Sequence, residues 1–211
     1  MLELNRLYNM DCMVGMKQFP DKYFELAIVD PPYGIETRGH AQDRFRMGKS
    51  LEQVNDSKPT TEYFQELARV SQNQIIWGYN HLSDMLPSCR EFIFWYKRNP
   101  VITFADGELA WTSFQKTAKC FDYMYFGGVN QEKPKIHPTQ KPVALYKWLL
   151  KNYAKPGDKI LDTHVGSASS LIACYDMGFD FIGFEIDKDY YEAAQERMRI
   201  HMQQQTIFEL L

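Results

Sequence analysis

A carboxylate and two prolines follow an apolar stretch near the start of the chain. Residues 25–29 are Glu-Leu-Ala-Ile-Val, a composition typical of a buried strand, and Asp30, Pro31, Pro32 and Tyr33 come directly after them. Proline has no backbone N–H, so the turn presents carbonyl oxygens without neighbouring donors. The Asp30 carboxylate and the Pro31 carbonyl therefore form a pair of acceptors that could receive both hydrogens of an –NH2 group.

This pair of acceptors suits attack by an aromatic amine, whose nitrogen is a poor nucleophile because its lone pair is delocalised into the ring. Hydrogen bonds to Asp30 and to the Pro31 carbonyl would hold the hydrogens out of the ring plane, so that the lone pair could attack a methyl sulfonium in line. The same acceptors would stabilise the positive charge that develops on nitrogen, and Tyr33 offers a flat face for stacking. A simple turn that closes a strand is the alternative, but such a turn requires neither the carboxylate nor the tyrosine.

A second expected strand, residues 159–161, leads into Asp162 and a loop of small residues. Residues 166–168 are Gly-Ser-Ala, and small side chains let a ligand approach the backbone at the start of a helix. Glu185 follows about 20 positions later, a spacing typical of acids that bind ribose hydroxyls in nucleotide-binding α/β folds. The loop has neither the glycine pattern of dinucleotide sites nor the Gly-Lys-Ser/Thr ending of a P-loop. A ligand with a ribose and no phosphate is left, and S-adenosylmethionine fits that description.

Short strand-like runs alternate with amphipathic helical stretches. The expected strands are residues 4–8, 25–29, 74–77, 91–96, 108–112, 159–161 and 181–184, and the expected helices are residues 13–18, 61–70, 143–153, 169–177 and 190–202. Such alternation predicts an α/β sheet covered by helices on both faces. A length of 211 residues suits a single domain over residues 1–211.

The composition excludes several classes of protein. A hydrophobic content of 45% and an aromatic content of 15% argue against disorder. No apolar run approaches the roughly 20 residues that cross a bilayer, and the first residues lack the pattern of a signal peptide, so a cytoplasmic protein without a membrane partner is expected. None of the 4 cysteines lies in a C-x-x-C pair, and the 5 histidines lack metal-ligand spacing. Neither a disulfide framework nor a metal site is expected.

The net charge of −3 conceals an uneven distribution. Residues 97–151 hold nine basic side chains against four acidic ones, and a polar stretch over residues 35–58 carries several more bases. A basic region on a mildly acidic body permits a local contact with DNA. A solvated charged face explains the same counts equally well. The bases considered for nucleic-acid contact are Arg38, Arg44, Arg46, Lys49, Lys97 and Arg98.

Together these segments resemble the β class of DNA amino-methyltransferases, in which the catalytic tetrapeptide precedes the cofactor loop. The matching segments are Asp30-Pro31-Pro32-Tyr33 (catalytic tetrapeptide), His137-Pro138-Thr139-Gln140-Lys141-Pro142 (ahead of the cofactor half), residues 162–169 (cofactor loop), Glu185 (ribose acid) and Asn9-Met10-Asp11-Cys12 (contact to the cofactor's adenine). The matches cover almost the whole chain in the family's order, and the compact size is similar to small phage or prophage adenine methylases.

The resemblance implies a Rossmann-like fold of S-adenosylmethionine-dependent methyltransferases, with a mixed, mostly parallel sheet and a circularly permuted motif order. It implies methyl transfer to N6 of an adenine flipped out of DNA, as in restriction-modification systems. Catalysis would fall to Asp30, Pro31, Pro32 and Tyr33. The implied cofactor-binding residues are Asp11, Cys12, Asp30, Thr139, Lys141, Asp162, His164, Gly166, Ser167 and Glu185. Thr139 and Lys141 would border the methionine part of the cofactor, and residues 35–58 would form a mobile loop that contacts DNA.

Three other functions stay open at the level of sequence. An N4-cytosine methyltransferase would present the same acceptors, although an aspartate at the first position of the tetrapeptide favours adenine. A protein-glutamine methyltransferase generally has asparagine there and the opposite motif order. A catalytically silent DNA-binding module with the same fold would not need Asp30, Tyr33 and Glu185 together.

The span from Phe126 to His137 is too short for the large target-recognition region usual in the family. Sequence recognition would then be relaxed, reside in residues 35–58 or depend on a second subunit in a homodimer.

Overall fold

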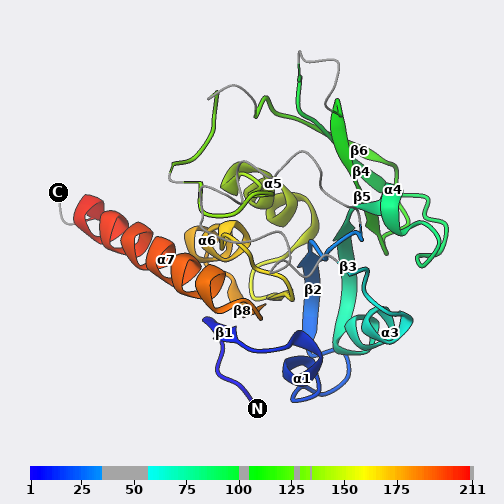
Figure 1. Ribbon diagram of the computed structural model, residues 1–211, viewed down its shortest axis with the longest axis horizontal. Helices are drawn as coiled ribbons and strands as arrows, with labels where there is room; N and C mark the ends of the chain where they lie inside the picture. The colour runs from blue at the N-terminus through cyan, green and yellow to red at the C-terminus, as the bar shows by residue number, and fades with distance from the viewer. Residues whose placement is uncertain (35–56, 100–104, 126–128, 134, 210–211) are drawn as a thin grey trace.

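The computed structural model describes residues 1–34, 57–99, 105–125, 129–133 and 135–209. Within these residues the strands form one eight-stranded sheet in the order β1-β8-β7-β2-β3-β5-β4-β6 (Figure 1). The strands are β1 (Arg6–Asn9), β2 (Phe24–Val29), β3 (Ser71–Trp77), β4 (Phe92–Tyr96), β5 (Gly107–Thr112), β6 (Lys119–Asp122), β7 (Lys159–Asp162) and β8 (Asp180–Glu185). Strands β1, β8, β7, β2 and β3 are parallel, whereas β5 is antiparallel to both β3 and β4. The predicted mixed, mostly parallel sheet is confirmed.

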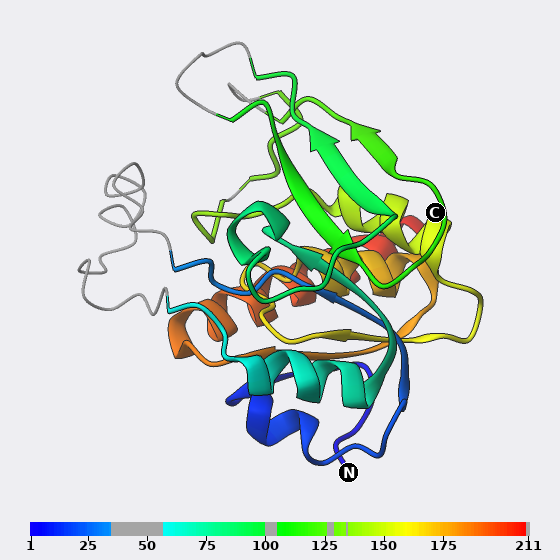
Figure 2. The same cartoon turned by 90° about the vertical axis from the view of Figure 1, so that its right-hand side faces the viewer.

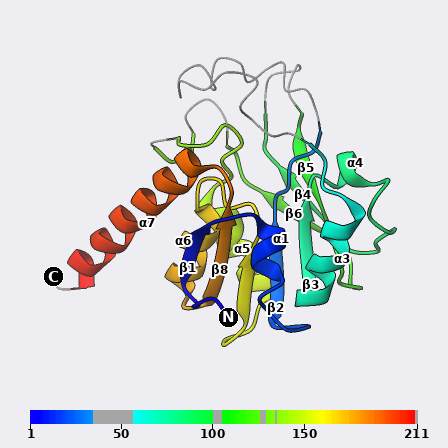
Figure 3. The same cartoon turned by 60° about the horizontal axis from the view of Figure 1, so that its bottom comes forward.

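Helices cover both faces of the sheet, as the alternation in sequence predicted. They are α1 (Cys12–Met16), α3 (Thr61–Val70), α4 (Tyr79–Leu82), α5 (Val143–Tyr153), α6 (Ser169–Met177) and α7 (Lys188–Glu209). In Figure 2, α1 and α3 lie on one side of the sheet and α5 on the other. Figure 3 shows α7 running outward from the body of the molecule.

Strand β2 is buried on both faces, which explains its nearly continuous apolar sequence. Leu26 and Ile28 belong to the core cluster that includes side chains of α5 and α6, and Ala27 and Val29 belong to the cluster that includes those of α1 and α3. Side chains of a strand alternate between its faces, so one run of apolar residues supplies both cores. This central strand therefore holds Asp30, the next residue, at a rigid position.

The register of the parallel strands brings the predicted acids to one edge of the sheet. Leu161 of β7 is paired with Ala27 of β2 and with Ile182 of β8. Asp30 follows β2, while Asp162 and Glu185 are the last residues of β7 and β8. The carboxyl ends of parallel strands meet at the same edge, where ligands bind in open α/β sheets.

Most of the expected elements are present. Helices α3, α5 and α6 have the predicted bounds, and each predicted strand lies within three residues of an observed one. The sequence pattern missed β6 and α4, which are four residues long and therefore too short to show a period. Helix α7 extends beyond the predicted residues 190–202 at both ends.

Candidate active site

The Asp30 carboxylate is held by two donors from different parts of the chain. The Lys141 ammonium donates to Oδ2, and the Tyr33 hydroxyl donates to Oδ1. Lys141 Nζ also lies 3.2 Å from Oε2 of Glu108, a residue of β5. Glu108 in turn forms an ion pair with Lys97. We call these four alternating charges, Asp30, Lys141, Glu108 and Lys97, the charge network.

The two central charges of the network, Lys141 and Glu108, are stabilised by their neighbours. Burial alone would lower the pKa of Lys141, but the charges of Asp30 and Glu108 raise it above its ordinary value. Burial alone would raise the pKa of Glu108, but Lys141 and Lys97 outweigh that effect and lower it to about 2. The Lys141 side chain is only 3% exposed, so this ammonium is a buried cation that depends on its two carboxylates.

The Tyr33 ring is positioned by the turn after β3. Gly78 has a φ of +81°, and a Cβ atom added there would lie 2.1 Å from Tyr33 Cε1. His81 of α4 stacks on the Tyr33 ring, with 5.3 Å between ring centroids and 16° between ring planes. Burial, followed by the charge of Asp30, raises the pKa of Tyr33 well above its ordinary value. The hydroxyl therefore stays protonated and acts as a donor to Asp30.

Asp162 is a buried carboxylate that accepts hydrogen bonds from the loop after β7 and from the start of α6. It accepts the His164 N–H at 3.0 Å on Oδ1 and the Ser170 hydroxyl at 2.5 Å on Oδ2. The residue is 2% exposed. Burial raises the pKa of Asp162 to about 7, and the charges of Asp30 and Glu185 act in the same direction. Asp162 is thus close enough to Asp30 and Glu185 for their charges to oppose its ionisation.

The His164 imidazole is held by a short chain of hydroxyl groups. Thr163 Oγ1 lies 2.9 Å from His164 Nδ1 and 2.6 Å from the hydroxyl of Tyr63 in α3. Burial lowers the pKa of His164 to about 4. The ring is therefore neutral at physiological pH.

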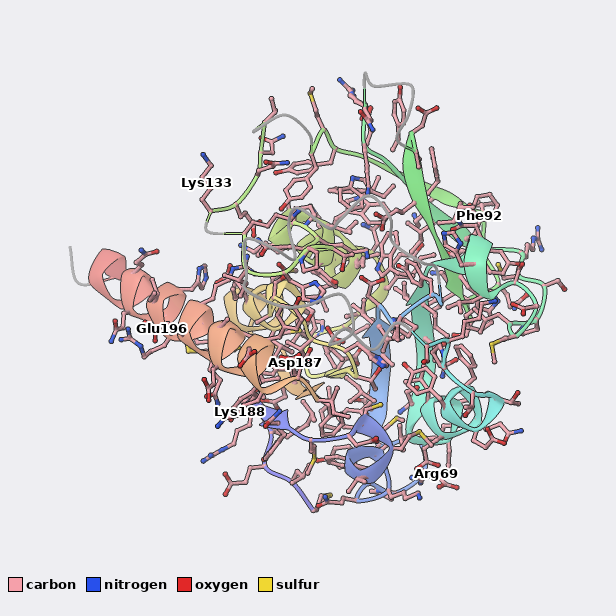
Figure 4. The ribbon with its side chains drawn as sticks, in the orientation of Figure 1. Arg69, Phe92, Lys133, Asp187, Lys188 and Glu196 are labelled. Carbon is pink, nitrogen blue, oxygen red and sulfur yellow. The ribbon has the colours of Figure 1, made fainter. Side chains whose placement is uncertain are left out.

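Glu185 connects the cofactor loop to the end of β8. Its Oε2 accepts the Gly166 N–H at 2.9 Å, and its Oε1 accepts the Asp187 N–H at 2.9 Å. Asn9 of β1 donates to the Glu185 carbonyl at 2.9 Å. The Asp187 side chain also accepts the Asp189 N–H at the start of α7. Figure 4 labels Asp187. Glu185 is thereby fixed in place by backbone groups from two loops.

The cofactor loop contains two residues in the left-handed conformation. Gly166 has a φ of +54°, and a Cβ atom there would lie 3.4 Å from the His137 ring. Ala168 has a φ of +63° at the N-cap of α6. Only glycine adopts this conformation without steric cost, so Ala168 is a strained position in the loop.

Arg197 of α7 donates hydrogen bonds to the cofactor loop and to the start of α6. Its Nη1 donates to the Ser167 carbonyl at 2.5 Å and to Ser169 Oγ at 2.9 Å, while Nη2 pairs with Glu132. Glu132 also accepts the Val143 N–H at 2.7 Å. One guanidinium thus joins the cofactor loop to the segment that carries Thr139 and Lys141.

The other predicted cofactor residues are Asp11, Cys12 and Thr139, and they make local contacts. Asp11 accepts the Met13 N–H at 2.7 Å and caps α1. Cys12 is part-buried, and burial, followed by the charge of Asp11, raises the pKa of its thiol to about 12. Thr139 Oγ1 lies 3.1 Å from His137 Nδ1.

Residues 63–196 match a family model for DNA methylases that modify N6 or N4 amino groups. The chain belongs to this family. The Type II methyltransferase M.HinfI of Haemophilus influenzae is 24% identical over 257 residues, which cover 93% of this chain and 68% of that protein. M.HpaI of Haemophilus parainfluenzae is 24% identical over 238 residues, which cover 92% of this chain and 74% of that protein.

Solved structures of DNA methyltransferases share the fold. The M1.HpyAVI–SAM complex superposes with a TM-score of 0.61 at 21% identity, covering 92% of this chain and 98% of that one. TTHA0409 of Thermus thermophilus, complexed with S-adenosyl-L-methionine, gives 0.60 at 17% identity, with 93% of each chain covered. The PvuII DNA methyltransferase, described as cytosine-N4-specific, gives 0.57 at 14% identity, covering 92% of this chain and 90% of that one. The predicted fold class is confirmed.

The predicted DNA-contacting residues of this DNA methylase fall into two groups. Arg38, Arg44, Arg46 and Lys49 lie outside the described residues, as does most of the loop predicted over residues 35–58. Lys97 pairs with Glu108, and Arg98 makes two 2.6 Å contacts with Asp122. Contact with DNA stays a prediction for both groups.

Sequence reasoning missed several residues that hold this methylase's site together: Tyr63, Gly78, His81, Glu108 and Arg197. None belongs to a segment with a recognisable motif. Gly78 and His81 do follow the end of a strand, which is the one signal that could have drawn attention to them. Among the described residues no group of His, Cys, Asp and Glu is arranged to hold a metal ion, and no described helix is long and apolar enough to span a membrane.

Proposed function

We propose that this DNA methylase transfers the methyl group of S-adenosylmethionine to the exocyclic N6 amino group of an adenine flipped out of DNA. The observation that carries the proposal is the placement of Asp30 beside Asp162 and Glu185, at one edge of neighbouring parallel strands. The acceptors for the amine would then lie next to the site for the sulfonium cofactor. Methyl transfer requires the amine and the sulfonium to be neighbours.

The residues at the end of β7 and β8 fit S-adenosylmethionine. The cofactor supplies a methyl group on a positively charged sulfonium. Asp162 is a buried carboxylate whose ionisation is opposed by burial, so a cationic ligand beside it would relieve an existing electrostatic cost. Each oxygen of a carboxylate can accept more than one hydrogen bond, so Glu185 could also accept from ribose hydroxyls. The Gly166 and Ser167 backbone would border the methionine part.

The Asp30 side would receive the target amine. Asp30 and the Pro31 carbonyl would accept its two hydrogens, and the Tyr33 ring would stack on the base. Because the Tyr33 hydroxyl already donates to Asp30 Oδ1, entry of the amine requires that hydroxyl to give way or to share the oxygen. Flipping a base costs a few kcal/mol, and stacking on Tyr33 would offset part of that cost.

Adenine is the proposed target because an aspartate begins the tetrapeptide. Cytosine N4 offers the same –NH2 group to the same acceptors, so the base must be identified chemically. Contacts from residues 35–58, Lys97 and Arg98 to DNA belong to the proposal. A homodimer stays a prediction, and the molar mass measured by light scattering in solution would test it.

Nucleoside mass spectrometry of DNA from cells that express the chain tests the proposed function. We expect N6-methyladenine with the wild-type chain and none with Asp30→Ala. N4-methylcytosine alone would overturn the choice of base. Undiminished methylation by the Asp30→Ala variant would overturn the role of Asp30, and the absence of any methylated base with a folded wild-type chain would overturn the activity.

A further inference from the structure

The charge network poses an electrostatic problem for methyl transfer. As the methyl group moves to the amine, positive charge develops on the target nitrogen, and a carboxylate next to it stabilises that charge. Lys141 places an ammonium directly on Asp30. A fully paired Asp30 would have its negative charge largely cancelled at the position where the reaction needs it.

The position of Glu108 reduces this cancellation of the charge of Asp30. Glu108 Oε2 lies 3.2 Å from Lys141 Nζ, on a strand separate from the one that presents Asp30. The ammonium is therefore shared between two carboxylates, and it also lies 5.5 Å from the centroid of the Trp77 ring. Sharing the ammonium leaves more of the charge of Asp30 available to a third partner.

The same contacts explain why Lys141 would remain when the amine arrives. Of the two donors on Asp30, Tyr33 uses one neutral hydroxyl, whereas Lys141 is a buried cation with a second carboxylate beside it. Removing a buried cation from its partners costs far more than rotating a hydroxyl away from one acceptor. Lys97 pairs with the opposite oxygen of Glu108 and so fixes that carboxylate in turn.

We propose that Glu108 is a positioning residue for methyl transfer: it holds the Lys141 ammonium at Asp30 Oδ2 and offsets its charge, so that Asp30 can accept from the target amine. This inference rests on the proposed function, because it assigns Glu108 a part in that reaction. Glu108 acts through Lys141 and Asp30 and does not itself touch the substrate.

Glu108→Gln tests the proposal, because it keeps the shape of the side chain and removes the charge. The substrate is DNA from cells that lack amino-methylation, and the readouts are the single-turnover rate of methyl transfer, KM for DNA, S-adenosylmethionine affinity by calorimetry and the unfolding midpoint. We expect the transfer rate to fall about 10- to 100-fold, which is less than the roughly 100- to 1,000-fold loss on removal of a direct electrostatic contact, because Glu108 acts through Lys141. KM for DNA and cofactor affinity should change by less than about threefold.

Glu91→Gln is the matched control. Glu91 is a fully buried acid just before β4, where one of its oxygens accepts the Lys116 N–H at 2.8 Å, and it is no part of the charge network. This control should lose stability and keep the transfer rate. Equal loss of rate in both variants would show that removing either acid lowers the rate only through its effect on folding, and would overturn the proposal.

A double-mutant cycle isolates the link to Lys141. Lys141→Gln alone should slow transfer, because Asp30 then loses the donor that holds its carboxylate in position. Glu108→Gln should have no further effect in that background, because no ammonium is left to offset. Additive losses would overturn the proposed route through Lys141. A wild-type chain that transfers no methyl group would instead refute the proposed function, whereas an active wild type matched by Glu108→Gln would refute this inference alone.

Discussion

The carboxylate of Asp30, the candidate catalytic residue, already accepts hydrogen bonds from other residues of the chain. Both oxygens of Asp30 accept a hydrogen bond, one from Tyr33 and one from Lys141. A buried or half-buried acceptor left without donors would be costly, so the Tyr33 hydroxyl fills a place that an amine hydrogen would later take. The hydroxyl and the aromatic ring of Tyr33 therefore have separable roles.

Tyr33→Phe and Tyr33→Ala separate these two roles. Phenylalanine keeps the stacking face and removes only the temporary donor, so its single-turnover transfer rate should stay within about threefold of wild type. Alanine removes the ring, and loss of base stacking, worth about 1–3 kcal/mol, should lower the transfer rate or the affinity for DNA by roughly 5- to 150-fold. A phenylalanine variant as slow as the alanine variant would show that the hydroxyl itself takes part in the reaction.

The identity of the acids could be predicted from sequence, but their partners could not. Asp30, Asp162 and Glu185 each end a strand-like run, and that pattern is local. The expectation that Lys141 borders the methionine part of the cofactor stays a prediction, and the contact of its ammonium with Asp30, 111 positions earlier in the chain, was not foreseen. A contact between residues so far apart depends on how the strands are ordered, which no local pattern of spacing records.

At the scale of elements, the turn from β3 into α4 determines where the Tyr33 ring lies. Gly78 adopts a positive φ, and its Cα faces the ring so closely that no side chain fits between them. His81, one turn of helix later, stacks on the same ring. A four-residue helix without an apolar period therefore has a positioning role that its sequence does not reveal.

Gly78→Ala should lower methyl transfer by more than its effect on stability explains. Both Gly78→Ala and the control Gly157→Ala place alanine at positive φ, +81° and +91°, which costs about 1–2 kcal/mol. Only at Gly78 would the new Cβ meet the Tyr33 ring, whereas nothing lies within 4 Å of a Cβ at Gly157. Urea unfolding should show both losses of stability, and the transfer rate should fall at least tenfold for Gly78→Ala alone. Equal rates in the two variants would mean that the ring can shift without consequence.

The regular elements were predictable where burial imposes a period or a continuous apolar run. Helix α3 shows the clearest amphipathic pattern, and β2 is apolar at every position except Glu25 because both of its faces are covered. The end of β8 was also visible, because Glu185 interrupts an apolar run. By contrast, β6 reads Lys-Cys-Phe-Asp, and only its parallel pairing with β4 makes it a strand.

At the scale of the whole molecule, the parallel sheet gathers negative charge at one edge. Asp30, Asp162 and Glu185 lie at the ends of three neighbouring strands, and the charges of Asp30 and Glu185 add to burial in raising the pKa of Asp162 to about 7. The fold thus carries an electrostatic cost that a cationic cofactor would relieve. This cost should be measurable as a dependence of global stability on pH.

Asp162→Asn should become more stable relative to wild type as pH rises from 5 to 8. In the unfolded chain Asp162 ionises near its ordinary pKa of 3.8, but in the folded protein it ionises only near 7. Between those values the folded state binds the extra proton, so the free energy of unfolding of wild type falls with pH by up to about 1.4 kcal/mol per unit for this group. Asparagine resembles the protonated acid and escapes that loss. Buried His164, with its pKa lowered to about 4, contributes the opposite slope below pH 6.5, but it is present in both proteins and cancels in the comparison.

Urea unfolding at each pH, with and without S-adenosylmethionine, measures this difference. Asp84→Asn is the control: Lys58 lowers the pKa of Asp84, so this surface acid is ionised in both states above pH 5 and its difference from wild type should be constant. With the cofactor present, the wild type should recover the stability that ionisation of Asp162 removes, because the ligand's positive charge favours the carboxylate, whereas Asp162→Asn should gain less. Suppose that, without cofactor, the free energies of unfolding of wild type and Asp162→Asn differ by the same amount at every pH. Asp162 would then be ionised in the folded protein throughout this range, and the three acids at this edge of the sheet would carry no electrostatic cost.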